Sequence, residues 1–217
     1  VHPPRLTCGF QNLQLHDGYL GCYRNMQIPH WMHQDVTDDY LYDLRNALGE
    51  DADINATGAE CNSWVTHPWI YEERLHPTNW VADRSIRFLK TRDRTRPFFL
   101  MSSFVRPHQP LDPPQTYFDM YKDKALRLPA DGDWDPQEGC GTAGRISDSI
   151  YGCCDESMRL DAMAGYYASI THVDHQLGRI LTALKEDGVY DDTIILFTSD
   201  HGEMLFDHHL WRKVFPY

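Results

Sequence analysis

The strongest constraint on the fold is a long helical pattern that leads directly into a short, entirely apolar segment. Between residues 158 and 187, apolar side chains recur every three or four positions, which gives one apolar stripe along a helix. Gly188 stands where such a helix would end. "DDTIILFTS" (191–199) follows, and its seven apolar or β-favouring residues are typical of a strand that is buried on both faces.

The same order occurs once more upstream. "HPTNWVADRSIRFLKTR" (76–92) predicts a helix with Thr78 as its N-cap, and "RPFFLMSSFV" (96–105) predicts a second buried strand. Two helix–strand units in succession are typical of α/β proteins. We therefore expect an α/β fold with a mainly parallel sheet flanked by helices.

Two shorter helices and a long loop complete the predicted organisation. "TDDYLYDLRNALG" (37–49) predicts a helix with Thr37 or Asp38 as its cap, and "PQTYFDMYKD" (114–123) predicts another. Residues 124–157 are rich in Gly, Asp, Ser and Cys, which is typical of a functional or mobile loop.

Composition excludes several classes of protein. The chain of 217 residues is long enough for one domain, and its net charge of -12 argues against binding to nucleic acid or to an anionic membrane surface. No apolar run approaches the roughly 18 residues that a membrane-spanning helix needs. Of the six cysteines, Cys140 is placed to pair with Cys153 or Cys154, and the alternative is that the cysteines are free core residues.

Both predicted strands are followed by polar clusters. "RPHQP" (106–110) follows the first and "SDHGE" (199–203) follows the second. In parallel α/β sheets, ligands bind outside the carboxyl ends of the strands, so both clusters lie where chemistry is expected. Asp200 and His201 place a carboxylate beside an imidazole, which is one way to hold a divalent cation, although the dipeptide alone is more often a helix cap beside a surface histidine.

Two ordered segments resemble the sulfatase family of the alkaline-phosphatase-like superfamily. "RPFFLMSSFVRPHQPLDPP" (96–114) is similar to a strand and R-P-H-x-P loop of that family. "VDHQLGRILTALKEDGVYDDTIILFTSDHGEMLFDHHLWRK" (173–213) is similar to its helix, strand, S-D-H/N-G and D-H-x-L-W-x-K sequence. The resemblance covers roughly residues 77–123 and 158–217, while residues 1–75 resemble a bacterial arylsulfatase-like subgroup.

The resemblance implies roles for four residues. Asp200 and His201 would be metal ligands, and His108 and Lys213 would contact the sulfate oxygens or the leaving oxygen, as catalytic residues. Cationic and hydrogen-bonding groups placed there would stabilise the negative charge of the transition state. The family implies calcium, with manganese or zinc as alternatives because His201 is a nitrogen ligand. Side chains that would orient these groups, or be ordinary loop residues, are Arg106, Asp112, Glu203, Asp207, His208 and His209.

The family's nucleophile motif, C/S-x-P-x-R, surrounds none of the six cysteines. We therefore expect residues 1–217 to be the central part of a single sulfatase-like catalytic domain, with an incomplete fold, no activity alone and a tendency to self-associate. The expected substrate is a small-molecule or carbohydrate sulfate ester, and export from the cell is consistent with the family. The alternatives are a phosphoesterase or phosphonate hydrolase of the same superfamily, a non-catalytic binding module, and a metal-free structural domain.

Overall fold

The computed structural model describes residues 9–16, 38–54, 56–59, 63–133, 152 and 154–213. The chain forms two compact units, Val1–Ile54 and Asn55–Tyr217. Cys140 and Cys153 lie outside the described residues, whereas Cys154 is a free thiol. The prediction of one catalytic domain over residues 1–217 stays a prediction.

The first unit contains one described helix, α2 (Asp39–Leu48). Asp38 is its N-cap, because its carboxylate accepts a hydrogen bond from Leu41 N at 3.1 Å. The helix ends at Gly49, whose φ of 105° is readily adopted only by glycine. The sequence prediction of this helix is therefore confirmed, with Asp38 as its cap.

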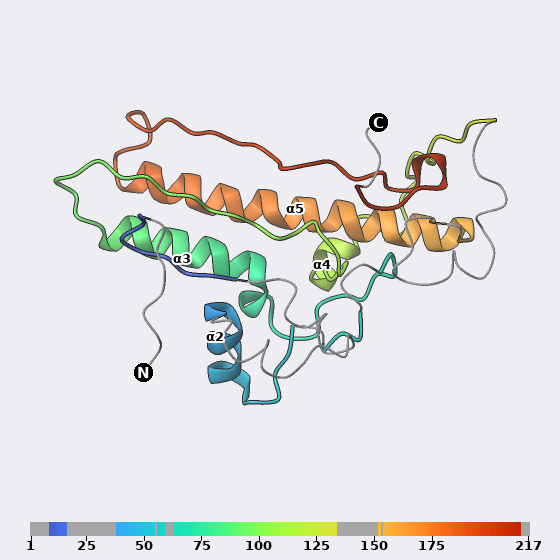
Figure 1. Ribbon diagram of the computed structural model, residues 1–217, viewed down its shortest axis with the longest axis horizontal. Coiled ribbons are helices and arrows are strands. Elements are labelled where there is room, and N and C mark those ends of the chain that lie inside the picture. The colour runs from blue at the N-terminus through green and yellow to red at the C-terminus, as the bar shows by residue number, and fades with distance from the viewer. Residues whose placement is uncertain are drawn as a thin grey trace. The chain divides into compact units, whose positions relative to one another are not determined.

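The second unit is built around two long helices, α3 (Pro77–Thr91) and α5 (Glu156–Glu186). In Figure 1 they run in the same direction. Each is followed by an extended segment that returns along it: the first extended segment (96–105) follows α3, and the second (191–199) follows α5. The short elements of this unit are η2 (Glu73–Leu75), α4 (Gln115–Phe118) and η4 (Asp207–His209). This helix–segment order matches the sequence prediction.

The ends of both long helices are set by local chemistry. The N-cap of α3 is His76 and not Thr78 as predicted, since Thr78 N donates to His76 Nδ1 at 3.1 Å and Pro77 occupies the first helical position. Asp155 caps α5 by accepting from Met158 N at 2.8 Å. Two residues beyond α5, Gly188 has a φ of 73°, as expected for a glycine that terminates a helix.

Two apolar clusters hold the second unit together. One lies between α3 and α5, where Phe98, Leu100 and Phe104 of the first extended segment pack against it. Its buried members are Ala82, Leu89, Ile180, Ala183 and Leu184. The other cluster surrounds the N-terminal half of α5 and consists of Trp64, Leu111, Ala162, Met163, Phe206 and Trp211.

The two predicted strands are extended but unpaired in the described part of the chain. No β-strand occurs among these residues, although an isolated bridge joins Thr66 to Leu111 in parallel. Phe99 is 74% exposed and Ile194 is 98% exposed, so the prediction of burial on both faces is wrong here. A strand acquires its hydrogen bonds and the cover of its second face from neighbouring strands. No described segment forms a ladder with either of these two.

None of the helices in the described ranges combines the length and the hydropathy of a membrane-spanning segment.

Candidate active site

The proline-rich loop (residues 106–114) carries His108 and follows the first extended segment. His108 Nδ1 lies 2.8 Å from Gln109 O. A carbonyl oxygen can only accept, so in the neutral ring Nδ1 carries the proton and Nε2 is the acceptor nitrogen. Burial, helped by the positive charges of Lys213, Arg106 and His201, outweighs the hydrogen bond to Gln109 O and lowers the pKa of His108 to about 4. The imidazole is therefore neutral near pH 7 and is a proton acceptor rather than a donor.

Asp200 and His201 follow the second extended segment, where the chain is exposed. His201 N donates to Asp200 Oδ1 at 3.0 Å, and His201 Nδ1 lies 2.8 Å from Gly202 O. The bond to a carbonyl again places the proton on Nδ1. In the neutral ring His201 Nε2 is then unprotonated and can coordinate a metal, and it lies 3.4 Å from Asp200 Oδ2. This pair of an imidazole nitrogen and a carboxylate fits part of a divalent-cation site.

Lys213 and His201 lie near enough to His108 to lower the pKa of its imidazole. Lys213 is exposed, and its charge lowers the pKa of both His108 and Glu203. Burial outweighs this effect at Glu203 and raises the pKa of its carboxyl. Asp200 joins the group as the neighbour of His201. Among the described residues, however, no third Asp, Glu, His or Cys completes a metal site.

A hydrogen bond connects the two loops directly. Gln109, which is 2% exposed, donates from Nε2 to Glu203 Oε2 at 3.3 Å. The other carboxylate oxygen, Glu203 Oε1, is buried and has no hydrogen-bond partner among the described residues. Sequence reasoning gave Glu203 a weak orienting role and gave Gln109 none, because a glutamine between two prolines carries no signal of a contact 94 residues away.

Of the weaker candidates, three make contacts with residues 130–131. Asp207 accepts from Ala130 N at 2.8 Å, His208 N donates to Ala130 O at 2.7 Å, and His209 lies 3.5 Å from Asp131. These contacts fix the loop against residues 130–131. The backbone here is strained, because positive φ angles occur at five non-glycine positions: Leu205, Phe206, His208, His209 and Arg212.

The other two weaker candidates, Arg106 and Asp112, form a buried ion pair. Arg106 Nε and Nη2 each lie 2.6 Å from one carboxylate oxygen of Asp112, and the side chains are 1% and 0% exposed. His76 Nε2 lies 3.2 Å from Asp112 O. Burial alone would raise the pKa of Asp112, but Arg106 and His76 outweigh it and lower that pKa to about 2. The sequence showed both residues but not this pairing.

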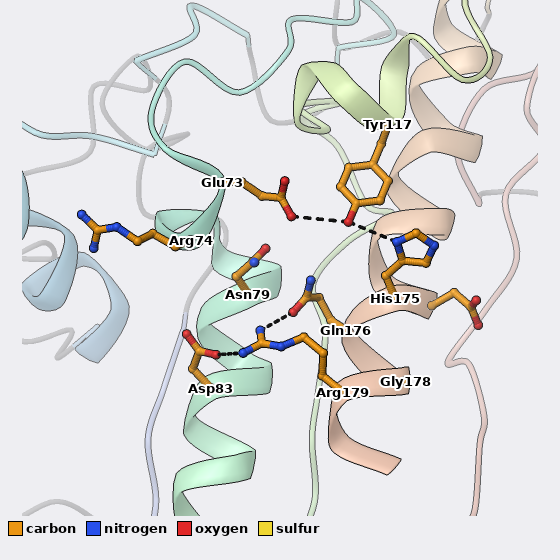
Figure 2. Close-up of a pocket in the computed structure, with 10 residues that line it drawn as sticks. Glu73, Arg74, Asn79, Asp83, Tyr117, His175, Gln176, Gly178 and Arg179 are labelled. Atoms are coloured by element: carbon orange, nitrogen blue, oxygen red, sulfur yellow. Dashed lines mark hydrogen bonds and ion pairs between the residues drawn. The ribbon is translucent and has the colours of Figure 1, made fainter. Parts of the chain in front are cut away.

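An open polar pocket of about 710 Å³ lies where α3, α4 and α5 meet, and sequence reasoning did not find it (Figure 2). Tyr117 Oη lies 3.4 Å from Glu73 and 3.2 Å from His175 Nδ1, while Arg179 bridges Asp83 and Gln176. The lining residues come from three helices and η2, so no linear motif could have revealed the pocket. Arg179 is neutralised by Asp83 within the wall, and Arg74 by Glu72 beside it, which fits a solvated surface better than a reaction centre.

Comparison with known proteins places these loops inside a family match. The sulfatase family model matches residues 26–214. An arylsulfatase from Clostridium perfringens is 50% identical over 217 residues, which are all of this chain and 45% of that protein. A choline-sulfatase from Rhizobium meliloti is 33% identical over 123 residues, covering 55% of this chain and 24% of that protein.

Solved structures give a similar result. A phosphonate monoester hydrolase of Agrobacterium radiobacter superposes with a TM-score of 0.67 at 27% identity, covering 90% of this chain and 45% of that one. A second phosphonate monoester hydrolase, from Silicibacter pomeroyi, superposes with a TM-score of 0.62 at 28% identity. These neighbours have the alkaline-phosphatase-like fold. The chain spans less than half the length of the relatives that it matches.

Proposed function

This chain belongs to the sulfatase family, and from that premise we propose that the natural full-length protein hydrolyses sulfate esters. The observation that supports the proposal is that Lys213 and His201, on one loop of the matched region, lie near enough to lower the pKa of His108 on the other loop. A sulfate ester gathers negative charge on its oxygens as the S–O bond breaks. Cationic and hydrogen-bonding groups at one place stabilise that charge.

In this proposal Lys213 and His108 contact the substrate. Lys213 supplies a point charge to a sulfate oxygen. His108 is neutral near pH 7, so its Nε2 accepts a hydrogen bond or a proton from a group at the reaction centre. A proton taken up in this way can then be donated to the leaving alkoxide or phenoxide. Burial of the proline-rich loop keeps the imidazole in one orientation.

We assign the divalent cation to Asp200 and His201, with calcium first and manganese or zinc as alternatives. The free Nε2 of His201 and the 85% exposed Asp200 side chain are suitable donors. When bound, such a cation neutralises sulfate charge and lowers the pKa of an attacking hydroxyl. Of the six cysteines none stands in C/S-x-P-x-R, so we place the attacking group outside these 217 residues.

One observation favours a second candidate function. Both structural neighbours named above are phosphonate monoester hydrolases, although this chain is less similar to them in sequence than to the arylsulfatase. Phosphonate monoesters and sulfate esters are both tetrahedral anions with one leaving oxygen. The groups at His108, His201 and Lys213 would stabilise either transition state, so geometry alone does not separate them.

The test is a substrate comparison on the natural full-length protein. We expect kcat/KM for 4-nitrophenyl sulfate to exceed that for the 4-nitrophenyl ester of phenylphosphonate. The variants His108→Ala and Lys213→Ala should each lose at least about tenfold in kcat/KM, as expected when a group that stabilises the transition state is removed. Lys124→Ala, which changes another exposed lysine, is the matched control and should retain full activity. A preference for the phosphonate ester would overturn the sulfatase assignment.

A further inference from the structure

The proline-rich loop is deeply buried but has few backbone hydrogen bonds of its own. Arg106, Gln109 and Asp112 are 3%, 2% and 0% exposed. Four of the nine residues are prolines, which have no N–H to donate. The main-chain bonds here are His108 N to Val105 O at 3.0 Å, His67 N and Trp69 N to the carbonyls of Leu111 and Pro113, and Tyr117 N and Phe118 N to Pro114 O at 2.9 and 3.2 Å. Side chains must therefore supply much of what holds the loop in one conformation.

The ion pair between Arg106 and Asp112 joins the two sides of this loop. Arg106 lies two residues before His108 and Asp112 four residues after it, so the paired side chains close a short ring of chain that includes His108. Both contacts are 2.6 Å long, and a bidentate pair fixes direction as well as distance. A shift of one partner would move the backbone on either side of His108.

The ion pair is anchored to α3 through His76. Thr78 N donates to His76 Nδ1, which leaves the ring proton on Nε2, directed at Asp112 O 3.2 Å away. The His76 ring also lies against that of His172 on α5, with centroids 4.7 Å apart. His172 in turn bonds Asn79 of α3 at 2.5 Å. Through His76 the loop is thereby connected to both α3 and α5.

We propose that Asp112 is a positioning residue for His108 and acts through its bidentate ion pair with Arg106. This inference rests on the proposed function, since it assumes that His108 contacts the substrate. Asp112 itself is fully buried and is not accessible to solvent. Misplacement of a catalytic group by about 1 Å can cost on the order of 100-fold in rate. The contribution of Asp112 should therefore appear in kcat rather than in KM.

The test uses Asp112→Asn in the natural full-length protein, because asparagine keeps the shape and removes the charge. We expect kcat to fall at least about tenfold with KM within about threefold of the wild-type value. Arg106→Lys keeps the charge but loses the planar fork, so it should lower kcat by a smaller factor. It is also the second variant should Asp112→Asn fail to fold.

Asp187→Asn is the matched control. Asp187 also pairs with arginines, and its bond to Arg92 Nη2 is 2.7 Å long between side chains that are each 7% exposed. It lies just after α5, where its ion-pair partners are Arg92 and Arg94 and not residues of the proline-rich loop. Asp187→Asn should lower the melting temperature as a lost buried ion pair does, yet leave kcat unchanged. Asp112→Asn should lower both.

A double-mutant cycle separates positioning of His108 from a general structural role. If Asp112 acts through His108, Asp112→Asn should cause no further loss of kcat in a His108→Ala background. The proposal would be overturned if the kcat losses of the two single variants multiplied in the double variant. It would also be overturned if Asp112→Asn alone kept kcat within about twofold of the wild type. The cycle can be run on whichever ester the wild type hydrolyses. A protein that prefers phosphonates would thus contradict the sulfatase assignment without deciding the role of Asp112.

Discussion

Gln109 donates a hydrogen bond to Glu203 across 94 residues of sequence, at 3.3 Å, and so joins the loop of His108 to the segment of Asp200 and His201. Both loops follow extended segments that return along helices packed on one another, and Figure 1 shows that the two segments run in the same direction. The two halves of the candidate site therefore come from two equivalent positions in the fold. The Gln109–Glu203 bond is where these halves meet.

Replacing Gln109 tests whether this bond aligns the two halves. Gln109→Leu removes the donor and leaves Glu203 Oε2 without this partner, next to an Oε1 that already has none among the described residues. A hydrogen bond to a charged group contributes about 1.5–3 kcal/mol. If all of this free energy serves to align the two loops, kcat/KM for an aryl sulfate should fall by roughly 10- to 100-fold.

Gln115→Leu is the control for that measurement. Gln115 also donates to a carboxylate, Asp119 Oδ1 at 2.7 Å, but on the exposed surface of α4. We expect its steady-state kinetics to match the wild type. Equal kinetics for Gln109→Leu and the wild type would show that the two loops are aligned by other contacts.

Metal dependence follows from the donors at residues 200–201. Chelation with EDTA should abolish hydrolysis by the natural full-length protein, and added calcium should restore it. His201→Asn exchanges a nitrogen donor for an oxygen donor, so the activity restored by calcium should rise relative to that restored by manganese or zinc. His175→Asn, in the pocket of Figure 2, is the control and should not alter the metal order. An unchanged metal order in His201→Asn would remove His201 from the ligand set.

The helices could be predicted from sequence because their determinants are local. Apolar periodicity and cap residues lie within a few positions of the elements that they specify, as Asp38 and Gly188 illustrate. The cap of α3 was misassigned to Thr78, because a histidine ring nitrogen is an uncommon acceptor at a helix start. Strand pairing is not local, so an apolar run such as residues 194–197 indicates a strand but not its partners.

The candidate site was predictable only as individual residues. His108, Asp200, His201 and Lys213 could be selected by motif, and their roles stay predictions. The contacts that organise them could not be read from sequence, because Gln109–Glu203 spans 94 positions and His172–Asn79 spans 93. Neither pair has a pattern of spacing that distinguishes it from ordinary polar residues. Buried polar partners are chosen by the fold, and a single sequence does not record that choice.

Gly165 should be intolerant of even a methyl group. A Cβ at this position of α5 would lie 2.3 Å from Thr66 Oγ1 and 2.8 Å from Thr66 Cγ2. Thr66 has little freedom to move, because its hydroxyl donates to Asp161 O at 3.0 Å and its backbone bridges to Leu111. Gly165→Ala should therefore lower the free energy of unfolding by about 1–3 kcal/mol, measured by urea denaturation.

Gly178→Ala is the matched control on the same helix. No atom lies within 4 Å of its Cβ position, so the better helix propensity of alanine should raise stability by about 0.5–1 kcal/mol. Adding Thr66→Ala to Gly165→Ala should recover part of the loss, since it removes both clashing atoms. Destabilisation by Gly178→Ala of the same size would mean that helix propensity, and not the contact with Thr66, governs both sites.

His172 should make stability depend on pH in the weakly acidic range. Burial lowers its pKa from 6.5 to about 2, and the charges of His76 and His175 act in the same direction. Between pH 6.5 and 4 the unfolded chain therefore takes up a proton at this residue and the folded chain does not. The free energy of unfolding should fall as pH falls, by up to about 1.4 kcal/mol per pH unit from this histidine. The depressed pKa values of His76 and His108 contribute with the same sign.

His172→Gln isolates the share of His172 in that dependence. Glutamine can still donate to Asn79 Oδ1, as His172 Nε2 does at 2.5 Å, but it does not titrate. The variant should be less stable than the wild type at pH 7, and the difference should shrink or reverse towards pH 4. Ser169→Ala, a buried change one turn earlier on α5, should differ from the wild type by the same amount at every pH. Parallel stability curves for His172→Gln and the wild type between pH 6.5 and 4 would mean that His172 is protonated equally in the folded and unfolded chain.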